Sequence, residues 1–306
     1  MRRFLLILIL LLLLIVAAFA TSGVLPGAGP PGAGPPGGLA LTGAPDAAGA
    51  RPPMTSHPTP YGLYLGTNMC YANSLIQCLM SLSEPFKRQV DKVISTDDNL
   101  SNLVTSAFQG NGRQQDPEEL LLALRVKSET EIGEFWASLK DLFYRARFSE
   151  RTLYCIANEW KLQTEVPYYT LAVAIPTEIK LGEDGFADNF TKADGTRAKR
   201  EYAFNDLLII RLQRFARDLS KNITRVNYSP TIYVGTDDGP VRYSLQAVCV
   251  HLGSFNRGHY IAYCKRGPQW YTFDDSNVHS MDEDKVVDND VHSPTKNAYM
   301  LFYAKS

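Results

Sequence analysis

Apolar positions follow two different rhythms along the chain. Between residues 70 and 82, leucine and isoleucine recur at the spacing of a helix, and further helices are expected over 120–126 and 131–142. After about residue 148, apolar residues form short runs that are typical of strands. The expected strands span 170–175, 207–212, 243–251, 259–264, 269–273 and 298–303. A helical part followed by a mainly antiparallel β part predicts an α+β fold.

Local signals add a helix start and an exposed stretch to this pattern. Asp116 is expected to be the N-cap of the second helix, with Pro117 at its first position and Glu119 where a capping-box acid stands. The polar stretch over 182–200 is rich in glycine and charge and is expected to be an exposed excursion. The first third of the globular part is therefore mostly helical.

The first 58 residues differ from the rest of the chain. Residues 4–20 carry no charge, follow Arg2 and Arg3, and end in a small-x-small pattern. Residues 1–20 are therefore predicted to be a secretory signal peptide or an uncleaved signal-anchor, which would attach the chain to a membrane through residues 4–20. Residues 21–58 are rich in proline, glycine and alanine and are expected to be a flexible linker. The sequence thus predicts a membrane-anchored or secreted protein and leaves the side of the membrane open.

Residues 59–306 are long enough for one large domain with an ample core. The whole chain has 31 basic and 32 acidic residues, which argues against an electrostatically driven nucleic-acid binder. Five cysteines without a C-x-x-C pair make a disulfide scaffold or a cysteine-rich zinc site an unfavourable interpretation. We therefore expect no metal and no cofactor.

A small set of residues suggests catalysis. His259 begins one expected strand and Asp274 ends the next, so an antiparallel pair joined by a turn at 265–268 brings them together. Cys70 lies at an expected helix N-terminus, where the helix dipole and a nearby imidazolium stabilise a thiolate. A thiolate, an imidazole and an orienting carboxylate form the activated nucleophile of cysteine hydrolases. The alternatives are a buried cysteine and a histidine and an aspartate at strand ends. Core positions are expected for the other four cysteines.

The motifs around these residues resemble those of the ubiquitin-specific proteases, which are papain-like cysteine deubiquitinases. Residues 62–77, GLYLGTNMCYANSLIQ, resemble the cysteine box of that family. Residues 258–263, GHYIAY, and 270–275, WYTFDD, resemble its histidine box. Three further segments, QQDPEEL at 114–120, LLIIRLQRF at 207–215 and AYMLFY at 298–303, are similar to family segments in the same order.

The resemblance implies a right-hand fold with a helical thumb, a β palm and shortened fingers. It implies that Cys70 is the nucleophile, His259 the general base and acid, and Asp274 the orienting carboxylate, with Asp275 as an auxiliary acid. Asn68 is implied to help line the oxyanion hole. The implied partner is ubiquitin or a ubiquitinated protein. Its C-terminal tail is expected to contact a set of four residues: Gln115, Asp116, Gly258 and Tyr260.

The sequence departs from the family pattern in two places. Family members commonly carry an asparagine five residues before the nucleophile, and here that position is Leu65. Many relatives bear two C-x-x-C pairs for zinc in the fingers, whereas here Cys155 stands alone and Asn158 takes the partner position. The departures keep open a catalytically weak ubiquitin-binding pseudoenzyme. A protease for a ubiquitin-like modifier also remains open beside the main hypothesis of a thiol-dependent deubiquitinase.

Overall fold

The computed structural model describes residues 60–306, apart from residues 96–99, 109–115, 132, 176–187, 237–238 and 288–293. All described residues belong to one compact unit, residues 55–306. The predictions for residues 1–20, for residues 21–58 and for Gln115 lie outside the described residues. Within the described part, no helix is both long enough and apolar enough to span a membrane.

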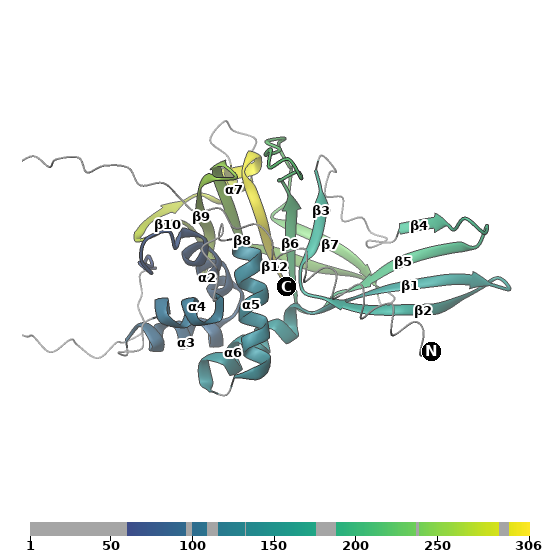
Figure 1. Cartoon of the computed structure of the whole chain (residues 1–306), viewed down its shortest axis with the longest axis horizontal. Helices are drawn as coiled ribbons and strands as arrows, with labels where there is room; N and C mark the ends of the chain where they lie inside the picture. Colours follow the sequence, from purple (N-terminus) through teal and green to yellow (C-terminus); the bar gives the residue numbers. More distant parts are fainter. Residues whose placement is uncertain are drawn as a thin grey trace, which may run out of the picture. The chain divides into compact units, whose positions relative to one another are not determined.

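Helices dominate the first half of the described chain and strands the second half, which confirms the predicted α+β class (Figure 1). The helices are α2 (Cys70–Leu82), α3 (Glu84–Ile94), α4 (Leu100–Phe108), α5 (Pro117–Thr130), α6 (Glu134–Ala146) and α7 (Glu283–Val287), with a 3₁₀ turn η1 (Pro294–Lys296). The strands are β1 (Phe148–Ile156), β2 (Glu159–Tyr168), β3 (Leu171–Ala174), β4 (Asp188–Thr191), β5 (Arg197–Ala203), β6 (Leu207–Gln213), β7 (Thr231–Thr236), β8 (Gly239–Ser254), β9 (Arg257–Arg266), β10 (Gln269–Asp274), β11 (Asn277–Met281) and β12 (Ala298–Lys305).

Helix α2 is the central helix, since it is buried on nearly all sides. Its residues from Tyr71 to Met80 are all buried, and it packs against β8, β9 and β10 as well as against α3 and α5. Two contacts from β9 hold it in place: the Arg266 guanidinium donates to the Gln77 Oε1 at 2.7 Å and to the Gln77 carbonyl at 3.0 Å. The helix that begins with Cys70 is therefore fixed directly to the strand that carries His259.

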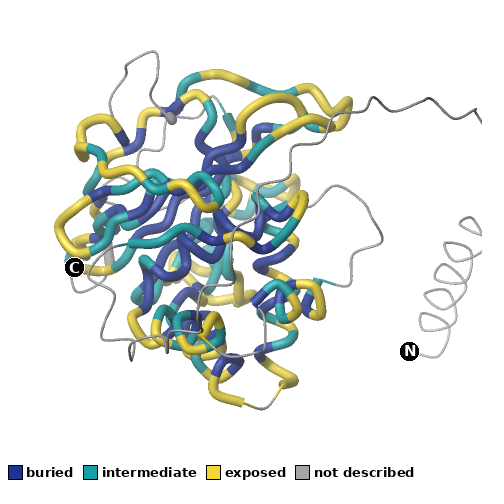
Figure 2. Tube along the Cα trace, turned by 90° about the vertical axis from the view of Figure 1, so that its left-hand side faces the viewer, coloured by how far each residue is buried: buried dark blue, intermediate teal, exposed yellow. Residues whose placement is uncertain are grey.

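The large sheet has the strand order β11-β10-β9-β8-β12-β6-β3, with β7 paired to β8. Its strands are antiparallel except for the parallel pair of β3 and β6. Alternate residues of β6 and β12 belong to two separate cores, which explains why these strands read as continuous apolar runs. One core lies between the helices and the sheet, and the other lies on the opposite face of the sheet. Figure 2 shows the buried residues gathered in the middle of this unit.

A second sheet, of order β2-β1-β5-β4, lies to one side of the large sheet (Figure 1). The excursion expected over 182–200 is exposed in its described residues, where only Ala198 is buried, but it is regular in structure, because β4 and most of β5 fall there. Charged side chains obscured the strand pattern: Arg200 pairs with Glu150 across the sheet at 3.2 Å, and Lys199 lies over the Trp160 ring at 5.0 Å. Strand β2 is exposed along its whole length, so burial left no pattern to read.

The helix boundaries also differ from those expected. Asp116 is confirmed as the N-cap of α5, since its Oδ1 accepts from the Glu118 N–H at 2.7 Å, but α5 is longer than 120–126. Helices α3 and α4 were not expected. Ser83 caps α3 by accepting from the Phe86 N–H at 3.4 Å, a signal that the sequence does contain.

Candidate active site

Cys70 is the first residue of α2 and is half-buried. The loop before it turns through two residues with positive φ, Gly66 at 113° and Asn68 at 60°. Met69 occupies the N-cap without a side-chain cap hydrogen bond, and its carbonyl accepts from the Ala72 and Asn73 N–H groups, each at 2.9 Å. The N–H groups of a first helical turn have no partner within the helix, so this end of α2 presents donors and a positive dipole end at Cys70.

The groups around the Cys70 sulfur have opposing effects on the pKa of its thiol. Burial raises the pKa of the thiol, and the nearby Asp275 carboxylate also raises it, whereas hydrogen bonds from the Tyr260 and Tyr71 backbone N–H groups lower it. The net pKa lies above the ordinary value, so the free protein holds a thiol that needs a proton acceptor. The contact with Tyr260 places that thiol beside the residue that follows His259.

His259 and Asp274 meet as the sequence predicts. Strands β9 and β10 pair antiparallel around a turn at Gly267 and Pro268, and the His259 Nε2 lies 2.6 Å from the Asp274 Oδ1. An ionised carboxylate only accepts, so the Nε2 carries the proton in this pair and the Nδ1 holds the lone pair. Both side chains are partly exposed, at 40% and 47%, which leaves the imidazole accessible to a substrate.

Asp275 is held by residues from the loop before Cys70 and from α2. The Asn73 Nδ2 donates to the Asp275 Oδ1 at 2.5 Å, and the Leu63 N–H donates to the Asp275 carbonyl at 2.9 Å. Gly62 packs so closely on the turn after β10 that a Cβ on Gly62 would lie 2.4 Å from the Ser276 carbonyl carbon. The cysteine-bearing and histidine-bearing segments are thus joined at the turn after β10. Sequence reasoning missed Asn73, since spacing along α2 does not reveal its partner.

His259, Asp274 and Asp275 are also the cluster in the described part whose ligand atoms all lie within 4.8 Å of one another. One atom of each residue takes part in a hydrogen bond of the site, in the His259–Asp274 pair or in the Asn73–Asp275 pair. The cluster is therefore explained by hydrogen bonding within the site.

The sequence suggested two roles for Asp116, the N-cap of α5 and contact with the ubiquitin tail, and the structure shows the first. Besides capping α5, its carboxylate accepts from the Tyr299 hydroxyl at 2.6 Å, and burial raises its pKa. Tyr299 in turn lies beside Tyr260, with ring centroids 5.9 Å apart. Both carboxylate oxygens have partners in the free protein, and a tail-binding role of Asp116 stays a prediction.

Gly258 lies within strand β9, where it pairs with Gly253 of β8. A Cβ on Gly258 would lie 1.9 Å from the Nε2 of His251. The His251 ring is buried between Tyr260 and Phe215, with ring centroids at 4.6 and 5.2 Å. Gly258 is therefore needed to make room for a buried histidine directly beneath the start of β9.

His251 was not singled out by the sequence. Burial, with Lys221 and His259 nearby, lowers its pKa to about 4, so it is neutral at physiological pH. Neither ring nitrogen has a hydrogen-bond partner among the described residues. The ring thus acts as a packing element under the catalytic strand rather than as a proton carrier.

Leu65 and Asn68 lie in contrasting environments. Leu65 is 6% exposed within the core, and its carbonyl accepts from the Ser101 Oγ at 2.6 Å. Asn68 is exposed, two residues before the nucleophile. The family's usual asparagine position is therefore filled here by a core side chain, and Asn68 is the amide on the solvent side of this loop.

The remaining cysteines divide into two groups. Cys78, Cys249 and Cys264 are buried, as expected. Cys155 is not a core residue: it lies half-exposed on β1, where the Arg197 guanidinium donates to its sulfur at 3.0 Å. The expectation failed because β1 belongs to a sheet that is solvated on both faces.

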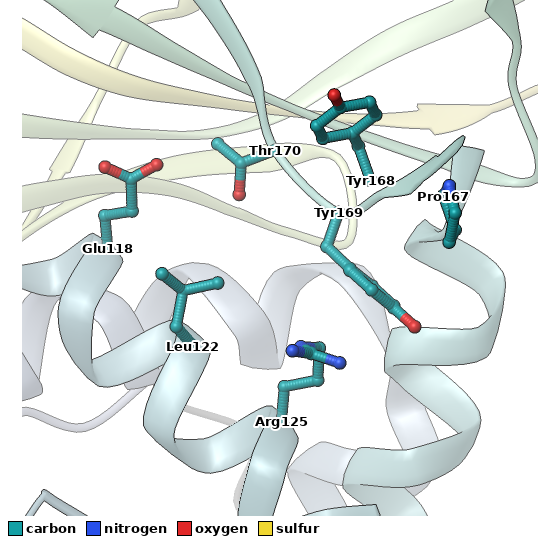
Figure 3. A pocket seen from close by; sticks show the side chains of 7 residues that line it. All are labelled: Glu118, Leu122, Arg125, Pro167, Tyr168, Tyr169 and Thr170. Carbon is teal, nitrogen blue, oxygen red and sulfur yellow. The ribbon is translucent and has the colours of Figure 1, made fainter. Parts of the chain in front are cut away.

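A separate cavity of about 440 Å³ lies between α5 and the segment that joins β2 to β3 (Figure 3). In its wall the Arg125 guanidinium stacks 4.6 Å from the Tyr169 ring centroid, and Glu118 pairs with Arg211 at 2.7 Å. The seven lining residues are Glu118, Leu122, Arg125, Pro167, Tyr168, Tyr169 and Thr170. No predicted site residue is among them.

Comparison with known proteins gives one consistent family. A family model described as ubiquitin carboxyl-terminal hydrolase matches residues 61–303. Ubiquitin carboxyl-terminal hydrolase 16 of Arabidopsis thaliana is 26% identical over 316 aligned positions, covering 80% of this chain and 30% of that protein. Ubiquitin carboxyl-terminal hydrolase 43 of Mus musculus is 48% identical over 65 residues, which are 21% of this chain and 5% of that protein. The chain thus spans less than a third of the length of these relatives.

Solved structures share the fold at lower identity. The SAGA Ubp8/Sgf11/Sus1/Sgf73 DUB module matches with a TM-score of 0.61 and 19% identity, covering 80% of this chain and 67% of that chain. The same module bound to monoubiquitin matches with a TM-score of 0.52 and 17% identity, covering 80% of this chain and 69% of that chain.

Proposed function

Because the chain belongs to the ubiquitin carboxyl-terminal hydrolase family, we propose that it is a thiol-dependent deubiquitinase. It would cleave the bond that follows the C-terminal glycine of ubiquitin. The fold is the papain-like right-hand fold, in which α2–α6 form the thumb, the large sheet the palm and the four-stranded sheet the fingers. The observation that carries the proposal is the convergence of Cys70, His259 and Asp274 where α2 meets β9 and β10.

The chemistry follows from the hydrogen bonds of the site. The unprotonated nitrogen of His259 takes the Cys70 proton, and the thiolate sulfur attacks the carbonyl carbon of the terminal glycine. The imidazolium, stabilised by Asp274, then gives its proton to the departing lysine amine, and the carbon–nitrogen bond breaks. Water, deprotonated by His259, attacks the resulting thioester and releases the free carboxylate and the Cys70 thiol.

The oxyanion of the tetrahedral intermediate needs hydrogen-bond donors. The backbone N–H at the start of α2 and the exposed amide of Asn68 are the donors proposed here. The Leu65 side chain offers no donor, and it is buried in the core. Asp275 is proposed to act as an auxiliary acid through its bond to Asn73.

Tail binding is proposed for the residues around Asp116. The path of the basic C-terminal tail would be lined by four residues: Asp116, Gln115, Gly258 and Tyr260. The support is that the Asp116–Tyr299–Tyr260 contacts join the start of α5 to the strand that carries His259. The related Ubp8 module that binds monoubiquitin supports ubiquitin as the partner.

The test exposes the full chain to electrophilic tail probes built on ubiquitin and on ubiquitin-like modifiers. Adduct formation with the ubiquitin probe, lost in Cys70→Ala, supports the proposal. Adducts with a ubiquitin-like probe alone would identify a protease for that modifier. Tight ubiquitin binding without any adduct would identify a pseudoenzyme, the alternative that Leu65 motivates.

We also propose that residues 1–20 direct the chain to a membrane or to secretion, that residues 21–58 tether the domain, and that residues 59–306 form the catalytic domain. The support is the uncharged run of residues 4–20 after two arginines. Protease protection of the full chain in microsomes tests this proposal. Release of the domain into the soluble fraction, with residues 1–20 intact, would contradict it.

A further inference from the structure

Lys221 makes an unusual set of contacts close to the catalytic strand. It lies on the loop that follows β6, and its Nζ donates to the His251 carbonyl at 2.6 Å, the Gly253 carbonyl at 3.1 Å and the Asn297 Oδ1 at 2.9 Å. An ammonium group has three N–H donors, so these contacts use all of them. The partners are neutral oxygens from the end of β8 and from the residue that precedes β12.

These contacts seal an edge of β8 that β12 leaves open. The pairing of β12 with β8 begins at Ala298 and Val250, and the His251 N–H still reaches the Asn297 carbonyl at 2.9 Å. Beyond that point the His251 and Gly253 carbonyls on the same edge face the Lys221 ammonium instead of a strand. Lys221 thus supplies the hydrogen bonds that a continued β12 would have supplied.

The opposite edge of the same segment carries the catalytic histidine. His251, Leu252 and Gly253 pair with Tyr260, His259 and Gly258 in that order. The backbone that Lys221 holds is therefore the direct cross-strand partner of His259 and of its two neighbours. One of those neighbours, Tyr260, supplies the N–H that bonds to the Cys70 sulfur.

Burial of the Lys221 ammonium is unfavourable, which argues that its three hydrogen bonds have a structural role. Lys221 is half-buried and Arg214 lies nearby; burial, with a smaller effect of Arg214, lowers the pKa of the ammonium to about 8. The Arg214 guanidinium is itself buried, and its Nη atoms donate to the Asn222, Thr224 and Thr295 carbonyls at 2.8–3.0 Å. The loop after β6 thus places two cations against backbone oxygens: Lys221 against the end of β8, and Arg214 against the loop itself and η1.

From this geometry we infer that Lys221 is a positioning residue for His259. It fixes the end of β8, and through the β8–β9 pairs it fixes the imidazole relative to Asp274 and to Cys70. The inference rests on the proposed hydrolase function. Loss of the three hydrogen bonds would leave the chain folded, since the β8 pairs from Tyr243 to Val250 do not depend on Lys221, but would loosen the start of β9.

The test compares Lys221→Met, which keeps the length of the side chain and removes its donors, with Lys221→Arg, which keeps charge and donors. Lys296→Met is the matched control, because Lys296 is an exposed lysine one residue before Asn297. Each full-length variant is assayed for kcat and KM on a fluorogenic ubiquitin C-terminal amide. The rate of Cys70 alkylation by iodoacetamide at pH 7 supplies a readout that needs no ubiquitin.

For Lys221→Met we expect kcat to fall about 10- to 100-fold with KM within about twofold, as for a small misplacement of a catalytic group. Alkylation of Cys70 should slow as well, Lys221→Arg should recover part of both rates, and Lys296→Met should match the wild type. A lower melting temperature with unchanged kcat and alkylation would overturn the inference, as would a rise in KM alone. If Lys221→Met does not fold, Asn297→Ala, which removes one acceptor, should lower kcat; unchanged kcat in that variant overturns the inference. A wild type without hydrolase activity would refute the proposed function, while the alkylation rates would still test Lys221.

Discussion

Replacing Gly258 by alanine tests whether the packing beneath the catalytic strand controls the chemistry. The added Cβ would stand 1.9 Å from the His251 Nε2, whereas ordinary van der Waals contact begins at 3.4 Å, so the ring or the strand must move by about 1.5 Å. The ring has little room to move, because it is buried between Phe215 and Tyr260. The start of β9, which carries His259, is therefore expected to shift.

The magnitude follows from two general scales. Overpacking of this kind costs ~1–3 kcal/mol of stability. A displacement of a catalytic group by about 1 Å lowers the rate about 10²-fold. We therefore expect Gly258→Ala to remain folded and to lose about 10²-fold in kcat/KM on a ubiquitin C-terminal amide, with most of the loss in kcat.

The double variant His251→Ala/Gly258→Ala supplies the decisive comparison, because it removes the ring that the new Cβ meets. If the clash is the cause, the double variant should be at least about tenfold more active than Gly258→Ala, a coupling between contacting residues. Losses that simply add would refute the reasoning. A rise in KM without rescue would show instead that the Cβ obstructs the ubiquitin tail.

Three further predictions concern the loop, the metal and the pH response. Asn68→Ala should lower kcat at least about tenfold with little change in KM, as expected for a lost oxyanion donor. Leu65→Asn should give no gain in activity and should lower the melting temperature, because it buries an amide in the core. Unchanged activity in Asn68→Ala together with strong activation in Leu65→Asn would favour the pseudoenzyme. Treatment with a chelator should leave activity and melting temperature unchanged, and stoichiometric zinc in the purified protein would contradict this. Because the pKa of His251 is lowered to about 4 in the folded protein, the unfolded chain binds the extra proton between about pH 6.5 and 4; the stability should fall as the pH drops through that window, and His251→Phe should flatten this part of the curve in denaturant titrations.

The sequence carries the parts of the site that depend on local order. The turn at Gly267 and Pro268 sets the β9–β10 register, and that register alone brings Asp274 to His259. The N-cap role of Asp116 is likewise local, since the acceptor and the donor are two residues apart. Hydrophobic spacing placed Cys70 at the start of α2 for the same reason.

The parts that could not be predicted depend on contacts between distant segments. The Asn73–Asp275 bond joins positions 202 residues apart, and the fit of Gly258 on His251 depends on how two strands stack their side chains. Strands β2 and β5 lie in a sheet that is solvated on both faces, so cation–π and charge pairs replaced the apolar alternation that reveals a strand. The contacts of Lys221 depend on where β12 begins relative to β8, which no local pattern encodes.

The proposed function depends above all on Cys70 as the nucleophile, and the initial rate of ubiquitin C-terminal amide hydrolysis tests this role most directly. The full-length wild type is compared with Cys70→Ala and with Cys155→Ala, a matched change at the other half-exposed cysteine of the described part. Cys70→Ala should abolish turnover while ubiquitin binding is retained, and Cys155→Ala should keep the wild-type rate. Substantial hydrolysis by Cys70→Ala would contradict the assignment of the nucleophile.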